Sequence, residues 1–182
     1  MSVHPLSGAP SPWVVRFSAC LPAGGAILDL ACGAGRHALW LAARGFRVDA
    51  ADRDRAALRA LAGAAGVVPV EADLEDGPWP FEPEKYDAVV VTNYLFRPRL
   101  RALRECLRPG GVLLYETFMR GNERFGKPAN PDFLLREGEL LELVRDGFSV
   151  IAFEQGEIAR PKPAMVQRIC AVKGSGLQLR LP

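Results

Sequence analysis

The chain has 182 residues, of which 49% are hydrophobic and 24% are charged, and its formal net charge is +2. A chain of this length buries about 70% of the surface that it exposes when unfolded, which is enough for a single domain. The small net charge gives no argument for a nucleic acid or a membrane surface as partner. No apolar stretch approaches the roughly twenty residues of a membrane span, and residues 1–12 lack the pattern of a signal peptide.

The cysteines and histidines exclude the common metal sites. The four cysteines are scattered without a CxxC pair, and His4 and His37 do not add ligand spacing to them. We therefore expect no metal and a cytoplasmic protein with reduced thiols. We also expect neither a nucleic acid nor a membrane as partner, and a monomer or homodimer.

Patterns typical of strands and helices alternate along the chain. Prolines and small polar residues predict a loose arm over 1–12, and the tail 174–182 is predicted to be loose, so the domain spans 13–173. Strands are predicted at 26–31, 46–51, 67–71, 86–92 and 112–117, and helices at 13–17, 36–44, 53–62, 98–107 and 137–145. This alternation predicts an α/β fold with a doubly wound, mainly parallel sheet. The last two strands, 148–158 and 164–172, are joined too closely for a helical crossover, which predicts an antiparallel pair.

A glycine turn follows the first predicted strand. The strand ends in Asp29, and Gly33 and Gly35 come just before the helix that starts at Arg36. Glycines at such a turn let a ligand approach the backbone closely. In an open α/β sheet, ligands bind beyond the carboxyl ends of the strands at the point where strand order reverses. The turn and Asn93-Tyr94, after the fourth strand, are therefore expected to face one crevice.

Asp52 closes the second strand, about twenty residues after the glycines. A carboxylate at this place accepts two hydrogen bonds from the hydroxyls of a ribose. The alternative is that Asp52 caps the helix beginning at Arg53. Asp52 alone does not decide between the two, but together with the glycine turn it favours a nucleoside ligand.

The ordered set of segments resembles the class I S-adenosylmethionine-dependent methyltransferases. The resemblance covers residues 13–172 and rests on Asp29 to Gly35, on Asp52, on Ala72-Asp73-Leu74, on the strand at 86–91 with Asn93-Tyr94, and on Leu107 to Leu113. The Gly35-Arg36-His37 continuation and the short chain are most similar to the small tellurite-resistance and thiopurine-type methyltransferases. The resemblance implies a Rossmann-like seven-stranded sheet of order 3-2-1-4-5-7-6 with an antiparallel last strand.

The resemblance also implies roles in binding S-adenosylmethionine and its product S-adenosylhomocysteine. Backbone groups of Ala31, Cys32 and Gly33 would hold the methionine amino group, with Asp29 orienting it. Arg36 would meet the methionine carboxylate, its alternative being a surface salt bridge. Asp73 and Leu74 would contact adenine, although Asp73 also suits a turn. Arg53 and Asn93 complete the expected cofactor site.

An NAD-dependent oxidoreductase is the nearest competing class. A pyrophosphate needs backbone amides at a helix terminus without an anion nearby. Asp29, just before the turn, suits instead the ammonium and sulfonium end of S-adenosylmethionine. Asp29 therefore argues against a dinucleotide.

Fewer residues are candidates for binding the methyl acceptor or for catalysis than for binding the cofactor. Methyl transfer acts mainly by alignment and exclusion of water, so a base is needed only for an acceptor such as a hydroxyl. His37 is a candidate base, with capping or packing as its alternative, and Tyr94 is a candidate for positioning the acceptor, with a core aromatic as its alternative. The loop after the fifth strand is expected to cover the acceptor and to contact it through Phe118, Arg120, Arg124 and Phe125. The alternative is that this loop is a solvated surface loop.

These features predict a methyltransferase that transfers a methyl group to a small molecule by in-line displacement. Asn93-Tyr94 lacks the double-proline tetrapeptide of enzymes that methylate the amino groups of bases, which disfavours that substrate. Two other hypotheses remain: a cofactor-binding sensor or accessory protein without catalysis, and, weakened by Asp29, the NAD-dependent oxidoreductase. The sequence does not identify the acceptor atom.

Overall fold

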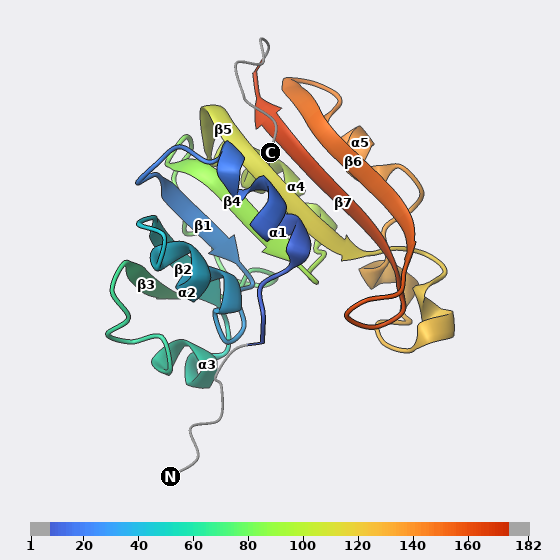
Figure 1. Cartoon of the computed structure of the whole chain (residues 1–182), viewed down its shortest axis with the longest axis horizontal. Coiled ribbons are helices and arrows are strands. Elements are labelled where there is room, and N and C mark those ends of the chain that lie inside the picture. Colours follow the sequence, from blue (N-terminus) through green and yellow to red (C-terminus); the bar gives the residue numbers. More distant parts are fainter. Residues whose placement is uncertain (1–7, 175–182) are drawn as a thin grey trace.

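The computed structural model of the protein describes residues 8–174. Seven strands form one sheet in the order β3-β2-β1-β4-β5-β7-β6 (Figure 1). Strands β1 to β5 run parallel, and β7 is antiparallel to both of its neighbours. The predicted fold class and strand order are therefore confirmed. The strands are β1 (Ala26–Leu30), β2 (Arg47–Asp52), β3 (Val67–Glu71), β4 (Tyr86–Thr92), β5 (Leu107–Phe118), β6 (Phe148–Ile158) and β7 (Ala164–Lys173).

Helices cover both faces of the sheet, because the strand residues alternate between two apolar cores. In β1, Ile27 belongs to the core that contains α1 (Pro12–Phe17), α2 (Arg36–Ala42) and α3 (Arg55–Arg59). The next residue, Leu28, belongs to the core that contains α4 (Leu100–Glu105) and α5 (Glu139–Val144). Figure 1 shows α1 and α2 in front of the sheet and α4 and α5 behind it. Short 3₁₀ turns are η1 (Ser18–Cys20), η2 (Arg97–Arg99), η3 (Asn122–Phe125) and η4 (Pro131–Phe133).

The connection from β3 to β4, residues 72–85, contains neither a helix nor a strand. Aromatic side chains cover the sheet there instead. The rings of Trp79 and Phe81 are 5.1 Å apart, and that of Phe81 lies 5.9 Å from Tyr86. This packing closes the core on the side where a crossover helix would otherwise lie.

Several predicted boundaries are wrong. The helix predicted at 53–62 covers only Arg55–Arg59, because the cap is Asp54 and the chain leaves the helix after Ala60. The helix predicted at 98–107 starts as a 3₁₀ turn and ends at Glu105. The strand predicted at 112–117 begins earlier, at Leu107, and residues 108–111 form an irregular start of β5, where the pairing with β4 shifts between Tyr86 and Ala88.

The predicted N-terminal arm is shorter than expected. Ser11 is 4% exposed, and its hydroxyl accepts a hydrogen bond from the backbone N–H of Trp13 at the start of α1. The packed domain therefore includes Ser11 and Pro12, which the prediction had assigned to the arm. Residues 1–7 and 175–182, the rest of the predicted arm and nearly all of the predicted tail, lie outside the described residues.

Within residues 8–174, no helix is long and apolar enough to cross a membrane. The same range contains no group of three or more His, Cys, Asp or Glu side chains arranged to hold a metal ion. Cys20, Cys32, Cys106 and Cys170 are buried and free.

Candidate functional site

The turn between β1 and α2 contains three residues with positive φ. These angles are 54° at Ala31, 54° at Gly33 and 72° at Gly35. A Cβ on Gly35 would lie 2.5 Å from Cδ2 of Leu61, so packing excludes a side chain there. At Gly33 the corresponding position has no atom within 4 Å. Gly35 therefore serves packing, whereas Gly33 leaves open space beside the backbone for a ligand.

Asp52, the last residue of β2, is hydrogen-bonded to this turn. Its Oδ2 accepts from the backbone N–H of Gly33 at 2.8 Å, and its Oδ1 accepts from that of Asp54 at 2.9 Å. The alternative that Asp52 caps the next helix is wrong, because Asp54 accepts from the first turn of α3. Each carboxylate oxygen of Asp52 retains a lone pair for a further donor.

Asp29 lies beneath the turn and is 1% exposed. Its Oδ2 accepts from the backbone N–H of Ala38 at 3.0 Å, in α2. Burial raises the pKa of Asp29 to about 7, although the Ala38 hydrogen bond and the charge of Arg36 act to lower it. Arg36 is half-buried and forms no ion pair with any other described residue, so the structure does not contain the surface salt bridge considered as its alternative role.

A cleft of about 180 Å³ lies at the carboxyl ends of β1 to β4. The predicted residues Ala31, Asp52, Arg53, Asp73, Leu74 and Tyr94 line it, together with Ala72 and Glu75. The structure thus brings together six of the predicted site residues. Glu75 was missed, although it follows the predicted segment 72–74 directly.

Asp73 starts a turn and also lines the cleft. Its Oδ1 accepts from the backbone N–H groups of Glu75 and Asp76, at 2.9 and 3.1 Å, so it starts a turn. These hydrogen bonds lower the pKa of Asp73, so its carboxylate is charged at neutral pH. It also lines the cleft beside the buried side chain of Leu74. The turn therefore fixes the acid at the rim of the cleft.

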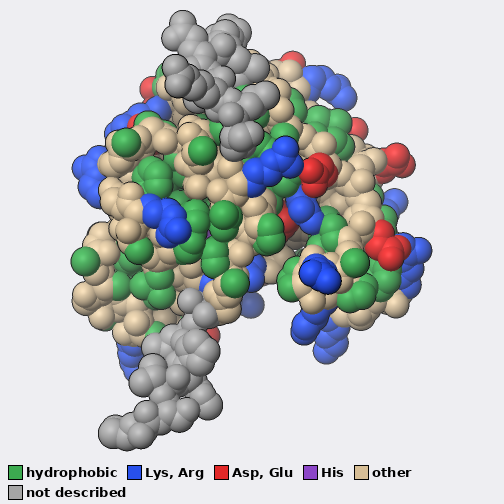
Figure 2. Space-filling model, in the orientation of Figure 1, with side chains coloured by type: hydrophobic (Ala, Val, Ile, Leu, Met, Phe, Trp, Pro, Cys, Tyr) green, Lys and Arg blue, Asp and Glu red, His purple; other side chains and the backbone are tan. Residues whose placement is uncertain are grey.

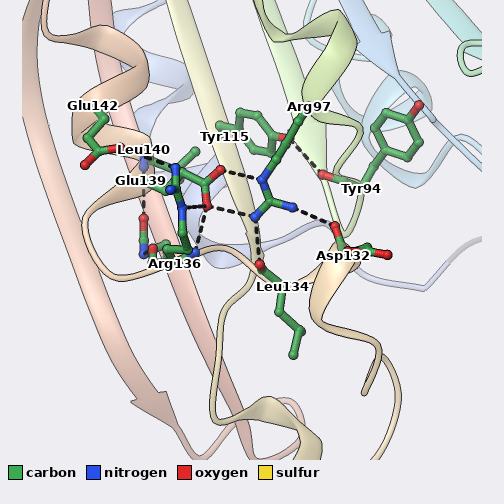
Figure 3. A network of polar contacts seen from close by, with 10 residues as sticks. Tyr94, Arg97, Tyr115, Asp132, Leu134, Arg136, Glu139, Leu140 and Glu142 are labelled. Atoms are coloured by element: carbon green, nitrogen blue, oxygen red, sulfur yellow. Dashed lines mark hydrogen bonds and ion pairs between the residues drawn. The ribbon is translucent and has the colours of Figure 1, made fainter.

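Tyr94 enters the cleft from the segment after β4. Its backbone carbonyl accepts from the hydroxyl of Tyr115 at 2.9 Å, which fixes the backbone at this point (Figure 3). Burial raises the pKa of Tyr94 to about 12, and the charges of Glu75 and Asp73 act in the same direction. Its own hydroxyl oxygen is buried and has no hydrogen-bond partner.

Comparison with known proteins shows what this arrangement is similar to. Residues 27–111 match the family described as "Methyltransferase domain". This part of the chain is therefore similar to a methyltransferase domain. A curated relative named demethylmenaquinone methyltransferase, from Clavibacter sepedonicus, is 41% identical over 101 residues. The matched part covers 50% of this chain and only 40% of that relative.

Solved structures share the fold of this chain. TehB from Haemophilus influenzae has a TM-score of 0.77 at 21% identity, over 92% of this chain and 63% of that chain. A SAM-dependent methyltransferase from Methanosarcina mazei has a TM-score of 0.70 at 18% identity, over 92% of this chain and 100% of that chain. The fold is therefore that of the class I S-adenosylmethionine-dependent methyltransferases, as the sequence resemblance implied.

His37, the candidate base, has a structural place in the fold. It is 1% exposed, its Nε2 accepts from the backbone N–H of Ser11 at 3.1 Å, and its Nδ1 lies 3.4 Å from Oγ1 of Thr92. Burial, together with the charge of Arg36, lowers the pKa of His37 to about 4. Both ring nitrogens are engaged inside the protein, so the prediction that His37 acts as a base is wrong.

Two further residues of the expected cofactor site lie just after strand ends. Asn93 has a positive φ of 56°, and its backbone N–H donates to the carbonyl of Glu116 at 2.9 Å. The Cys32 backbone N–H donates to the carbonyl of Ala51 at 2.9 Å, and burial raises the pKa of its thiol. Cys32 is therefore a neutral thiol that contributes to the turn through its backbone.

The loop after β5 is anchored to other parts of the fold. Asn122 is 2% exposed, its Oδ1 accepts from the backbone N–H of Met165, and its Nδ2 donates to the carbonyl of Pro128. Arg124 pairs with Glu157 of β6 at 2.8 Å. The four residues predicted to bind the methyl acceptor are Phe118, Arg120, Arg124 and Phe125. None of them lines the described cleft. Figure 2 shows a hollow between the lobe that this loop belongs to and the rest of the molecule.

A buried network holds this loop against the segment after β4 (Figure 3). Glu139, at the start of α5, is 6% exposed and accepts from Arg97 at 2.6 and 2.8 Å and from the backbone N–H of Arg136 at 2.7 Å. Arg97 also donates to the carbonyls of Asp132 and Leu134. Sequence reasoning missed this network, because Arg97 and Glu139 are 42 residues apart and belong to no recognisable motif.

Proposed function

We propose that this domain is an S-adenosylmethionine-dependent methyltransferase acting on a small molecule. The observation that carries the proposal is the contact between Asp52 and the glycine turn. The carboxylate lies 2.8 Å from the backbone nitrogen of Gly33, at the wall of the cleft. A carboxylate held in this way is suited to the two hydroxyls of a ribose, which favours a nucleoside ligand.

The chemistry of the other residues fits this cofactor. Asp73 would accept from an adenine amino group beside the apolar surface of Leu74. The backbone around Gly33, where a Cβ would meet open space, would hold the methionine part. Arg36, without an ion-pair partner in residues 8–174, would bind its carboxylate, and Asp29 would favour its ammonium group. The pyrophosphate of a dinucleotide would instead meet the Asp29 charge, which weakens the oxidoreductase alternative.

The chain would contribute alignment and exclusion of water. Bound S-adenosylmethionine supplies a methyl group on a positively charged sulfur that a nucleophile displaces in line. Neither His37 nor Tyr94 would act as a base in such a reaction, because His37 is bound to Ser11 and because Tyr94, with a pKa of about 12, stays protonated at neutral pH. We therefore expect an acceptor that needs no strong base, such as a thiol or an amine of low pKa.

The acceptor is proposed to bind between the cleft and the anchored loop after β5. Phe118, Arg120, Arg124 and Phe125 would contribute apolar and cationic groups there. The curated relative is named for demethylmenaquinone, so a quinol belongs with thiols, chalcogen oxyanions, catechols and small amines in the acceptor screen.

Isothermal titration calorimetry with S-adenosylmethionine, S-adenosylhomocysteine and NAD tests the ligand class. We expect both sulfur nucleosides to bind and NAD not to bind. Binding of NAD alone would overturn the proposal. A screen for transfer of a labelled methyl group then tests catalysis.

The second candidate is a cofactor-binding sensor or accessory protein. It is favoured by the positions of His37 and of the four loop residues, because none of these side chains lines the described cleft. Tight binding of S-adenosylmethionine without transfer to any acceptor in the screen would support it.

A further inference from the structure

The Tyr94 hydroxyl differs from the other polar groups of the domain interior. In residues 8–174, three buried side-chain polar atoms have no hydrogen-bond partner. Two of them are Nε atoms of Arg104 and Arg168, whose guanidinium groups contact Asp146 and Glu116. The third is the hydroxyl oxygen of Tyr94. Because buried hydroxyls are nearly always hydrogen-bonded, an unpartnered one beside a cleft indicates a ligand atom as its partner.

The backbone of Tyr94 is held from one side. The Tyr115 hydroxyl donates to the Tyr94 carbonyl at 2.9 Å. In Figure 3 the ring of Tyr94 extends away from the Arg97–Glu139 network. Arg99 holds the segment after β3, whose Leu74 lines the cleft with Tyr94, by donating to the carbonyls of Leu74 and Gly77.

The groups around the Tyr94 hydroxyl belong to the nucleoside end of the cleft. The charges that act on it are those of Glu75, Asp73, Arg53 and Arg99. Glu75, Asp73 and Arg53 line the cleft with Tyr94, as does Leu74, the residue expected to contact the base. The sequence suggested that Tyr94 positions the methyl acceptor, but the residues that line the cleft with it are those proposed above to bind the nucleoside.

We propose that the Tyr94 hydroxyl hydrogen-bonds the adenine base of the ligand and is a binding residue for the nucleoside. This inference rests on the proposed function. Adenine has an amino donor and a ring-nitrogen acceptor along one edge, and a neutral hydroxyl both donates and accepts. A base that offered no such group would leave the hydroxyl buried and unpaired, so the residue also contributes to selection of the base.

The test compares Tyr94→Phe with the wild type for two ligands, S-adenosylhomocysteine and 5′-methylthioadenosine. Both contain the same nucleoside, but 5′-methylthioadenosine lacks the amino-acid part. We expect the Kd to rise about fivefold for both, as for the loss of one neutral hydrogen bond. We also expect the melting temperature of the ligand-free variant to be equal to or above that of the wild type, because the substitution removes an unpaired buried group.

Tyr86→Phe is the matched control. Its hydroxyl donates to Asp49 at 2.7 Å, and it begins β4 at the opposite end of that strand from Tyr94. We expect this control to lower the melting temperature and to leave both dissociation constants unchanged.

Two results would overturn the inference while leaving the proposed function intact. One is unchanged binding of both ligands by Tyr94→Phe. The other is weaker binding of S-adenosylhomocysteine alone, which would assign the hydroxyl to the amino-acid end. If the wild type binds neither S-adenosylmethionine nor S-adenosylhomocysteine, the proposed function itself fails, and this inference fails with it.

Discussion

At the scale of single residues, Asp52 and Asp54 offer a matched pair of acids two positions apart. Asp52 lines the cleft, whereas Asp54 caps α3. We expect Asp52→Ala to weaken the binding of S-adenosylmethionine at least tenfold, because charge-assisted hydrogen bonds contribute about 1.5 to 3 kcal/mol each. Asp54→Ala should cost about 1 kcal/mol of folding stability through loss of the cap, with little effect on binding. Titration calorimetry and chemical unfolding measure both, and equal dissociation constants for Asp52→Ala and the wild type would contradict the prediction.

We expect Asp29 to release a proton when S-adenosylmethionine binds. Its pKa of about 7 leaves much of the carboxyl protonated at pH 6.5, and a nearby ammonium group would lower that pKa. Binding of S-adenosylmethionine should therefore release up to one proton from Asp29. Calorimetry at pH 6.5 in two buffers of different ionisation enthalpy measures the release.

Two comparisons separate this proton from others. Asp29→Asn should remove the Asp29 contribution, and 5′-methylthioadenosine, which has no ammonium group, should release none from the wild type. An equal release by Asp29→Asn and wild type would show that the proton comes from elsewhere.

The positions of Asp29, Asp52 and Asp73 in the site could be predicted from the sequence because each acid lies near the end of a predicted strand. The surroundings of Tyr94 and His37 could not be predicted in this way. The Ser11 N–H that occupies His37 lies 26 residues away, and the missing partner of the Tyr94 hydroxyl is a property of the packed cleft. Spacing along the chain contains no signal for either.

At the scale of elements, the Arg97–Glu139 contact joins η2 to α5 and holds residues 132–136 between them. Glu139→Gln should destabilise the domain by about 2 kcal/mol, because charge-assisted hydrogen bonds to a buried acid are weakened. We also expect faster hydrogen exchange in residues 130–136. Glu142→Gln is the control, since its 3.6 Å pair with Arg136 is exposed and contributes under about 1 kcal/mol. Equal losses of stability in the two variants would contradict a special role for Glu139.

Apolar periodicity predicted the existence and order of the elements but not their ends. The helix predicted at 53–62 stops at Arg59. Ala60, Leu61 and Ala62 are residues that favour a helix, but they lie outside the helix in the structure. The strand predicted at 112–117 starts at Leu107 because pairing with β4, a tertiary contact, extends it. The anchoring of the loop after β5 likewise depends on Asn122 and Met165, which are 43 residues apart.

At the scale of the whole molecule, the alternation of strands and helices already excluded other fold classes, and the family resemblance added the strand order. Two buried groups then link the stability of the domain to pH in opposite directions. His37 has a pKa of about 4, below its ordinary value of about 6.5, and Asp29 has a pKa of about 7, above its ordinary value of about 3.8. Arg36 lowers both pKa values, so it opposes the shift at Asp29 and adds to that at His37.

The signs follow from proton binding. As pH falls from 6.5 to 4, unfolded His37 takes up a proton that the native residue does not, so stability decreases, by about 3 kcal/mol at 1.36 kcal/mol per pH unit. Native Asp29 takes up a proton between pH 7 and 3.8 that the unfolded residue does not, so stability increases as pH falls.

The two contributions largely cancel in the wild type. His37→Gln should therefore gain stability, relative to its value at pH 7, as pH falls to 4, and Asp29→Asn should lose it. Urea unfolding at pH 7, 6, 5 and 4 measures these slopes, and a constant difference between each variant and the wild type would contradict the assignment.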